Sequence, residues 1–144
     1  MTGTKIDGKI IAQDVKDRVK KAVEELKSQG LNPCLATVLV GDNQASATYV
    51  RNKHKACEEV GILTKDHKLP SSLSQKELNE LIDSLNKDSG VHGILVQLPL
   101  PEQLDEFATT SRISPIKDVD GLTPHNVGLL SMGKPILKAC TPSG

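Results

Sequence analysis

Aromatic side chains are almost absent from this sequence of 144 residues. Tyr49 and Phe107 are the only two, and there is no tryptophan. The hydrophobic core must therefore be aliphatic, and Tyr49 cannot be explained as one member of an aromatic cluster.

Long apolar runs and blocks of like charge are also missing. The longest apolar stretches, such as residues 35–40, fall far short of the roughly 20 residues that a membrane-spanning helix needs. The N-terminus has no leader pattern of charged and then apolar residues. Eighteen basic residues balance eighteen acidic ones without a run of five like charges, which argues against a nucleic-acid or membrane partner. We expect a cytoplasmic protein with a small ligand.

Cysteine and histidine patterns typical of disulfide frameworks or metal sites are lacking. Cys34, Cys57 and Cys140 are an odd number at wide spacing, with no Cys-x-x-Cys pair, and the four histidines are scattered. The cysteines are interpreted as reduced thiols, and no metal is expected.

What is present is an alternation of strand and helix patterns in a length that suits one domain. Strand, helix, strand, helix, strand predicts an α/β fold, a three-layer βαβ domain with a mainly parallel sheet. Ser74 and Glu77 fit a capping box for one of its helices. Strands are predicted at about 35–40, 62–69 and 91–98, helices at about 8–27, 45–60, the 78–85 region and 102–108, and mostly loops from 111 to 144.

Ligands of open parallel sheets bind beyond the carboxyl ends of the strands, so the segments from Gly41, from Pro70 and from Gln97 are where a site is expected. Tyr49 and Lys53 stand one turn apart on a helix that follows the first strand, with Ser46 on the same side. In a partly desolvated pocket such a lysine could act as a general acid or base near neutral pH. From spacing alone, a solvated helix face is the more frequent arrangement.

Two further segments carry candidate polar groups. Gln97 ends an apolar strand, where its amide could contact a ligand or simply bond to the backbone. Asp120, in a loop before Gly121, could accept two parallel hydrogen bonds from an amidine-like edge, although an Asx turn is the commoner explanation. Residues 128–134 have the spacing of a phosphate loop, but Pro135 replaces the required Ser or Thr.

Four segments, taken in order, resemble the signatures of the bifunctional methylenetetrahydrofolate dehydrogenase/methenyltetrahydrofolate cyclohydrolase family. The resemblance covers the chain from about Lys5, and Ala139 stands where the family usually has proline. The segments are VGDNQASATYVRNKHKACEEVG at 40–61, GILVQLPLP at 93–101, KDVDG at 117–121 and ACTPSG at 139–144.

The resemblance implies that residues 1–144 form the N-terminal folate-binding catalytic domain, with the fold of amino-acid-dehydrogenase-like N-terminal domains. Lys53 would be the catalytic lysine, Tyr49 would stack on the folate rings, Gln97 would hold Lys53 or contact the reacting region, and Asp120 would bond the pterin edge. The implied catalytic set is Lys53, Tyr49, Gln97 and Asp120, and the implied substrate-binding set is Ser46, Tyr49, Lys53, Gln97, Leu98, Pro99, Leu100 and Asp120.

The family oxidises 5,10-methylenetetrahydrofolate with NADP or NAD and then hydrolyses the methenyl product to 10-formyltetrahydrofolate, in one-carbon metabolism that serves purine biosynthesis. Its members continue into a C-terminal NAD(P)-binding domain, which we expect to be absent from this chain, since no two glycines are separated by a single residue. A homodimer is expected of the complete enzyme. The alternative is a non-catalytic folate-binding or partner-docking domain.

Overall fold

Three parallel strands form one sheet in the computed structural model, which describes residues 7–140. The central strand β1 pairs along its whole length with β2 on one side, and residues 35–38 of β1 pair with β3 on the other. The predicted α/β class with a parallel sheet is confirmed. In chain order the elements are α1 (Gly8–Ser28), β1 (Cys34–Val40), α2 (Gln44–Val60), β2 (Leu63–Leu69), α3 (Gln75–Lys87), β3 (Gly93–Val96), α4 (Glu106–Arg112) and α5 (Pro124–Ser131).

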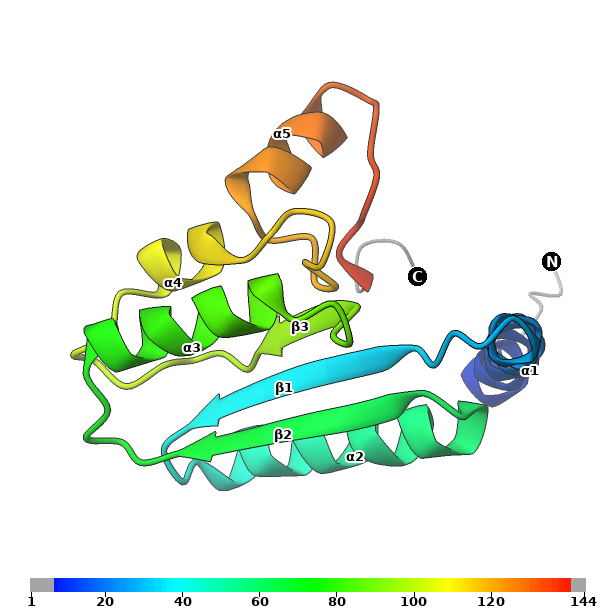
Figure 1. The fold of residues 1–144 in the computed structure, drawn as a ribbon, viewed down its shortest axis with the longest axis horizontal. Helices are drawn as coiled ribbons and strands as arrows, with labels where there is room; N and C mark the ends of the chain where they lie inside the picture. Colours follow the sequence, from blue (N-terminus) through cyan, green and yellow to red (C-terminus); the bar gives the residue numbers. More distant parts are fainter. Residues whose placement is uncertain (1–6, 141–144) are drawn as a thin grey trace, which may run out of the picture.

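The helices lie on both faces of the sheet because the chain reverses its direction of travel across it. The first crossover moves outward from β1 to β2, and the second returns past β1 to β3. With the same handedness, these crossovers place α2 and α3 on opposite faces. Figure 1 shows α3 and α4 along one face and α2 along the other, with α1 beside the C-terminal end of α2. The expected three layers are present.

The main core lies between the sheet and α3, and every side chain in it is aliphatic. Alternate residues of β1 point into this core, and the residues between them face α2. Thr37, for example, contacts His54 on α2. The buried members of the core cluster are Ala36, Val38, Val40, Leu78, Ile82, Leu85, Val91, Ile94, Val96, Leu100, Leu104 and Ile113.

Local sequence signals fix the ends of the central helices. The Ser74 side chain accepts from the Glu77 amide while the Glu77 carboxylate accepts from the Ser74 amide, so the predicted capping box is confirmed. Helix α2 starts after Asn43, whose side chain accepts from the Ser46 amide, and ends at Gly61 with a left-handed φ of 83°.

Two predicted boundaries were wrong. Strand β3 covers residues 93–96 rather than 91–98, since Val91 belongs to the preceding turn and Pro99 has no amide hydrogen with which to continue the ladder. Helix α4 begins at Glu106 rather than near Glu102. Asp105 caps it by accepting from the Ala108 amide.

The region after Ser111, predicted as mostly loop, contains the helix α5. Thr123 caps it through the Asn126 amide, and Pro124 occupies its first turn, a combination typical of helix starts.

The predicted amphipathic helix α1 is present, but its apolar stripe is largely uncovered by the described residues. Ile11 and Val15 are exposed, and Val23 is the buried residue of this helix. No helix within residues 7–140 combines the length and apolarity needed to cross a membrane.

Candidate active site

The candidate site lies on the α2 face of the sheet, beside the carboxyl end of β3. Strand order β2-β1-β3 places the change in winding direction between β1 and β3, which is where ligands of such sheets bind. Helix α2 leaves β1 at this edge and Gln97 directly follows β3. The sequence prediction for these two segments is therefore consistent with the topology.

Lys53 and Gln97 are brought together by this topology. In β3, Ile94 and Val96 point into the core on the α3 side, so alternation turns Gln97 toward α2. Its side-chain oxygen accepts from Lys53 Nζ at 3.4 Å. Its amide nitrogen donates to the Leu98 carbonyl at 2.7 Å, which fixes which end of the amide faces the lysine. Both side chains are half-buried.

The backbone of Gln97 is also held in place. Its amide donates to the Val38 carbonyl at 2.9 Å, one step beyond the last residue of β3. The Gln97 side chain is therefore attached to the sheet rather than to a freely moving loop. Because Gln97 is fixed to the sheet, its hydrogen bond also holds Lys53 Nζ in one position.

Asp120 reaches the same site from a segment that extends the sheet beyond β3. Asp118 forms a parallel bridge with Ile94, and the Ile94 amide donates to the Lys117 carbonyl at 2.7 Å. The segment lies close against the strand because Gly93 has no side chain: a Cβ there would stand 2.5 Å from Cγ1 of Val119. This contact determines where the loop that carries Asp120 can run.

The electrostatic surroundings link Asp120 to Lys53. Burial raises the pKa of the Asp120 carboxyl above its ordinary value, the positive charge of Lys53 acts in the opposite direction, and the negative charge of Asp118 raises it further. Lys53, Gln97 and Asp120, which the sequence places far apart, therefore belong to one constellation.

Tyr49 and Ser46 occupy different environments on α2. The Tyr49 ring is 63% exposed and stands one helical turn before Lys53, so a flat ligand above Lys53 could rest on it. Ser46 is only 4% exposed and is held under the first turn of the helix. This position suits support of the helix; contact between its hydroxyl and a ligand stays a prediction.

The exit loop after Gln97 forms a second wall at the strand ends. The Leu98–Pro99 peptide bond is cis, Leu98 is half-buried, and the Leu100 amide donates to the Glu106 carboxylate at 2.8 Å. Pro99 and Leu100 line a cleft of about 180 Å³ together with the turn after β1. The complete lining is Val40, Gly41, Asp42, Asn43, Ser71, Pro99, Leu100 and Pro101.

Sequence reasoning overlooked the residues that support the Asp120 loop. Lys117 Nζ donates to the carbonyls of Leu85, Asn86 and Asp88 at 2.8–3.0 Å, at the C-terminal end of α3. Asp118 is 2% exposed and is surrounded by donors from the start of α5. The adjacent Lys-Asp pair in the KDVDG segment was the available signal, because these two charged residues stand between the apolar residues Ile116 and Val119, and a charge that becomes buried needs a partner.

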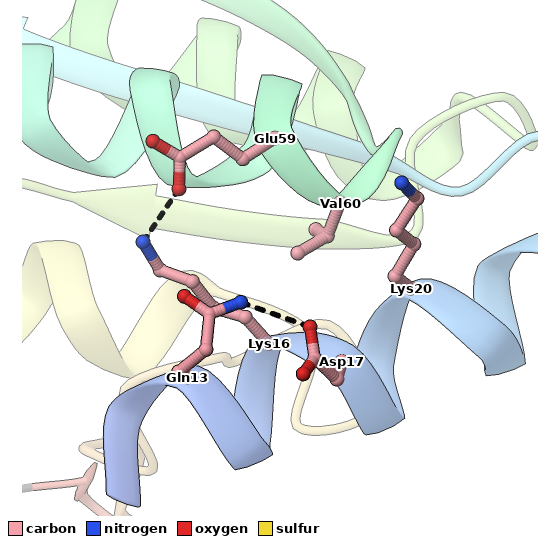
Figure 2. Close-up of a pocket in the computed structure, with 6 residues that line it drawn as sticks. All are labelled: Gln13, Lys16, Asp17, Lys20, Glu59 and Val60. Carbon is pink, nitrogen blue, oxygen red and sulfur yellow. Dashed lines mark hydrogen bonds and ion pairs between the residues drawn. The ribbon is translucent and has the colours of Figure 1, made fainter. Parts of the chain in front are cut away.

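A larger cleft of about 350 Å³ lies elsewhere, between α1 and α2. Figure 2 shows that four of its polar side chains bond in pairs: Lys16 pairs with Glu59, and the Gln13 amide donates to Asp17. Its size alone does not make it the functional site, because four of its five polar side chains already pair with one another. Among residues 7–140, no cluster of three or more histidine, cysteine or acidic side chains could hold a metal ion.

A parallel α/β domain that gathers a lysine, an amide and a carboxylate at its strand ends is a small-ligand domain of the type that enzymes use for substrates. The chain belongs to the tetrahydrofolate dehydrogenase/cyclohydrolase family, whose catalytic-domain model matches residues 6–120. The resemblance drawn from its four segments is thereby confirmed, although residues 141–144 of the last segment lie outside the described residues.

Individual relatives agree with this assignment. The chain is 81% identical over all 144 residues to the bifunctional protein FolD of Nitrosopumilus maritimus, of which it covers 50%, and 55% identical over 139 residues to that of Moorella thermoacetica, again 50% of the relative. The chain thus spans about half the length of the curated relatives it matches.

Solved structures of the family have the same fold. The FolD dehydrogenase/cyclohydrolase of Campylobacter jejuni superposes with a TM-score of 0.93 at 47% identity, over 95% of this chain and 49% of that one. The Trypanosoma brucei enzyme, solved in complex with NADP cofactor and inhibitor, gives 0.93 at 36% identity, over 99% of this chain and 50% of that one.

Proposed function

We propose that this chain is the folate-binding catalytic domain of an enzyme that oxidises 5,10-methylenetetrahydrofolate with NAD(P) and hydrolyses 5,10-methenyltetrahydrofolate to 10-formyltetrahydrofolate. The observation that carries the proposal is the contact of Lys53 with Gln97, one helical turn from the exposed ring of Tyr49, in a chain that belongs to the folate family. The positive charge of Lys53 also lowers the pKa of the Asp120 carboxyl, against the effect of burial. The cytoplasm and a homodimer of the complete enzyme are part of the same proposal.

Lys53 acts as the base in the hydrolysis. The neutral amine takes a proton from water as the water oxygen bonds to the methenyl carbon, and the cationic substrate beside it favours the neutral amine. The resulting ammonium returns the proton to N5 as the bond between that carbon and N5 breaks. The new hydroxyl group on the carbon releases its own proton to solvent, which leaves the formyl group on N10 and one proton in solution. Gln97 supports both steps, because its oxygen faces Nζ at 3.4 Å.

Asp120 and Tyr49 hold the folate in position for this chemistry. The Asp120 carboxylate accepts two parallel hydrogen bonds from the amino and ring N–H groups of the pterin edge, and the Tyr49 ring stacks on the flat part of the ligand. Leu98, Pro99 and Leu100 form the wall next to the reacting carbon. Each contact restricts the folate, so that the methenyl carbon stays near Lys53.

The described residues do not fit a nicotinamide dinucleotide. The turn after β1, which holds the phosphates in dinucleotide-binding folds, here carries Asp42, and Asn43 already caps the start of α2. We therefore assign the cofactor to a separate NAD(P)-binding domain outside residues 1–144, and derive no hydride step from these residues. The NADP complex of the Trypanosoma brucei relative supports a nicotinamide dinucleotide as the cofactor.

The decisive test is the loss of methenyltetrahydrofolate absorbance with the unaltered chain, Lys53→Met and Lys55→Met. We expect Lys53→Met to slow hydrolysis by roughly 100- to 10,000-fold, the range of general acid-base catalysis. Lys55→Met removes a neighbouring exposed ammonium from the same helix and should retain the rate. Equal rates for the unaltered chain and Lys53→Met would remove Lys53 from the mechanism.

The second candidate is a folate-binding domain without catalysis, favoured by the open position of Tyr49. Exposure of the ring leaves one side of the site in contact with solvent, whereas an enclosed site excludes water. Calorimetric titration separates the candidates: folate binding without turnover supports the second, and binding with Lys53-dependent turnover supports the first. NADP binding by residues 1–144 would contradict the assignment of the cofactor to another domain.

A further inference from the structure

Asp118 is the most deeply buried carboxylate near the site, and it has no role in the chemistry proposed above. Its side chain is 2% exposed, and a buried charge is costly unless donors surround it. Three donors do so. The amides of Leu122 and Thr123 donate at 3.2 and 2.8 Å, and the side-chain nitrogen of Asn126 donates at 2.9 Å.

These hydrogen bonds keep Asp118 ionised. Burial alone would raise the pKa of this carboxyl, but the bonds from Thr123, Asn126 and Leu122 together hold it below its ordinary value. Asn126 also donates to the Pro115 carbonyl at 2.9 Å. One carboxylate and one amide therefore connect the chain before the Asp120 loop with the first turn of α5 after it.

The loop between these two attachments has little freedom. Asp118 is bridged to Ile94 of β3 on one side. On the other, Gly121 has a φ of 66°, and a Cβ there would meet the backbone of Lys138 and Ala139 at 3.0 Å. Asp120 stands between the Asp118 anchor and the close approach at Gly121. The path of the backbone at Asp120 is therefore set by neighbouring residues that have no proposed contact with the ligand.

We propose that Asp118, together with Asn126, is a positioning residue that directs the Asp120 carboxylate into the folate site. The inference rests on the proposed function of that site and extends it to a buried pair. It differs from a purely structural role for Asp118, in which the carboxylate would stabilise the start of α5 without any specific effect on ligand binding.

A double-mutant cycle distinguishes these roles. The variants are Asp118→Asn, Asp120→Ala and the combination, and the measurement is calorimetric affinity for 5-formyltetrahydrofolate, a stable folate. We expect Asp118→Asn to weaken binding about tenfold, because an amide nitrogen facing backbone donors disrupts the anchor. In the Asp120→Ala background the same change should have no further effect.

Thr109→Val is the matched control. Thr109 is also fully buried, and its hydroxyl accepts from Gln75 between α3 and α4, on the opposite face of the sheet. Its replacement should lower the unfolding midpoint and leave folate affinity unchanged. If Asp118→Asn does not fold, Asn126→Ala keeps the carboxylate and its two backbone donors, and should weaken binding about threefold in the same Asp120-dependent manner.

The outcomes are separable. Equal losses from Asp118→Asn with and without Asp120 would overturn the positioning role and leave the proposed function intact. Unchanged folate affinity in Asp118→Asn would also overturn the positioning role and leave the proposed function intact. Absence of folate binding by the unaltered chain, or full binding by Asp120→Ala, would overturn the proposed role of Asp120 and the inference with it.

Discussion

Lys53 Nζ and Gln97 Oε1 lie 3.4 Å apart, although the residues are 44 positions apart in the sequence. One belongs to the helix that follows β1 and the other to the end of β3. Their contact depends on the parallel pairing of these strands. Substitution of Gln97 therefore changes the surroundings of the Lys53 amine without removing the lysine.

Gln97→Glu should move the acidic limb of the pH–rate profile of methenyltetrahydrofolate hydrolysis to higher pH by about one pH unit. A carboxylate next to Lys53 favours the ammonium form, so the neutral amine becomes available only at higher pH. Gln97→Met, which has a similar shape but no charge, should lower the rate without this displacement. The same profile for Gln97→Glu and the unaltered chain would exclude the contact from catalysis.

Asp120→Asn should stabilise the fold near neutral pH while weakening folate binding about tenfold. Because the pKa of Asp120 is raised in the folded state, mainly by burial, its contribution to stability is complete below the ordinary value of 3.8 and is lost as the pH rises through the raised value. The asparagine variant does not titrate. Unfolding midpoints should therefore differ at pH 7 and converge toward pH 3; a constant difference would contradict this explanation.

Gly93→Ala should destabilise the chain by about 1–3 kcal/mol, the usual cost of overpacking. The new Cβ would stand 2.5 Å from Cγ1 of Val119, a stiff β-branched side chain close to its own backbone. Urea unfolding measures the loss. Val119→Ala removes the obstructing atom, so the double variant should recover most of the stability, and an unrescued double variant would show that the cost arises elsewhere.

Ser74→Ala should cost about 1 kcal/mol in the free energy of unfolding, because it removes the side chain that caps α3. Ser72→Ala, at an exposed turn position two residues earlier, is the matched control and should change stability by less than about 0.5 kcal/mol. Similar losses from both variants would indicate a general effect of the segment rather than the cap.

The fold was predictable where periodicity and caps agreed. The β1 run, the Ser74 cap and the Gly61 stop each lie within a residue or two of the observed boundaries. Errors arose where a local capping signal was overlooked. Asp105 caps α4, which starts later than the predicted Glu102, and Thr123-Pro124 starts a helix in a region rich in turn residues.

The candidate site was predictable only in part. The spacing of Tyr49 and Lys53 showed that they share a helix face. The i, i+4 spacing does not reveal which residues from other elements face this side of the helix. The pairing of Lys53 with Gln97 and the approach of Asp120 depend on strand order, which spacing does not determine. Asp118 was missed because a buried charge in a loop can be recognised only once its donors are known.

The order of the site residues along the chain has a consequence for its synthesis. Tyr49 and Lys53 come first, Gln97 follows two strands later, and Asp120 comes last, from the segment that bridges to β3. Parallel strands pair only after the intervening helix has been made, so these contacts close large loops of chain. A nascent chain on the ribosome therefore carries Lys53 long before it carries the other residues of the proposed folate site. Under the proposed function, the chain becomes competent for the reaction only after the last of these contacts has formed.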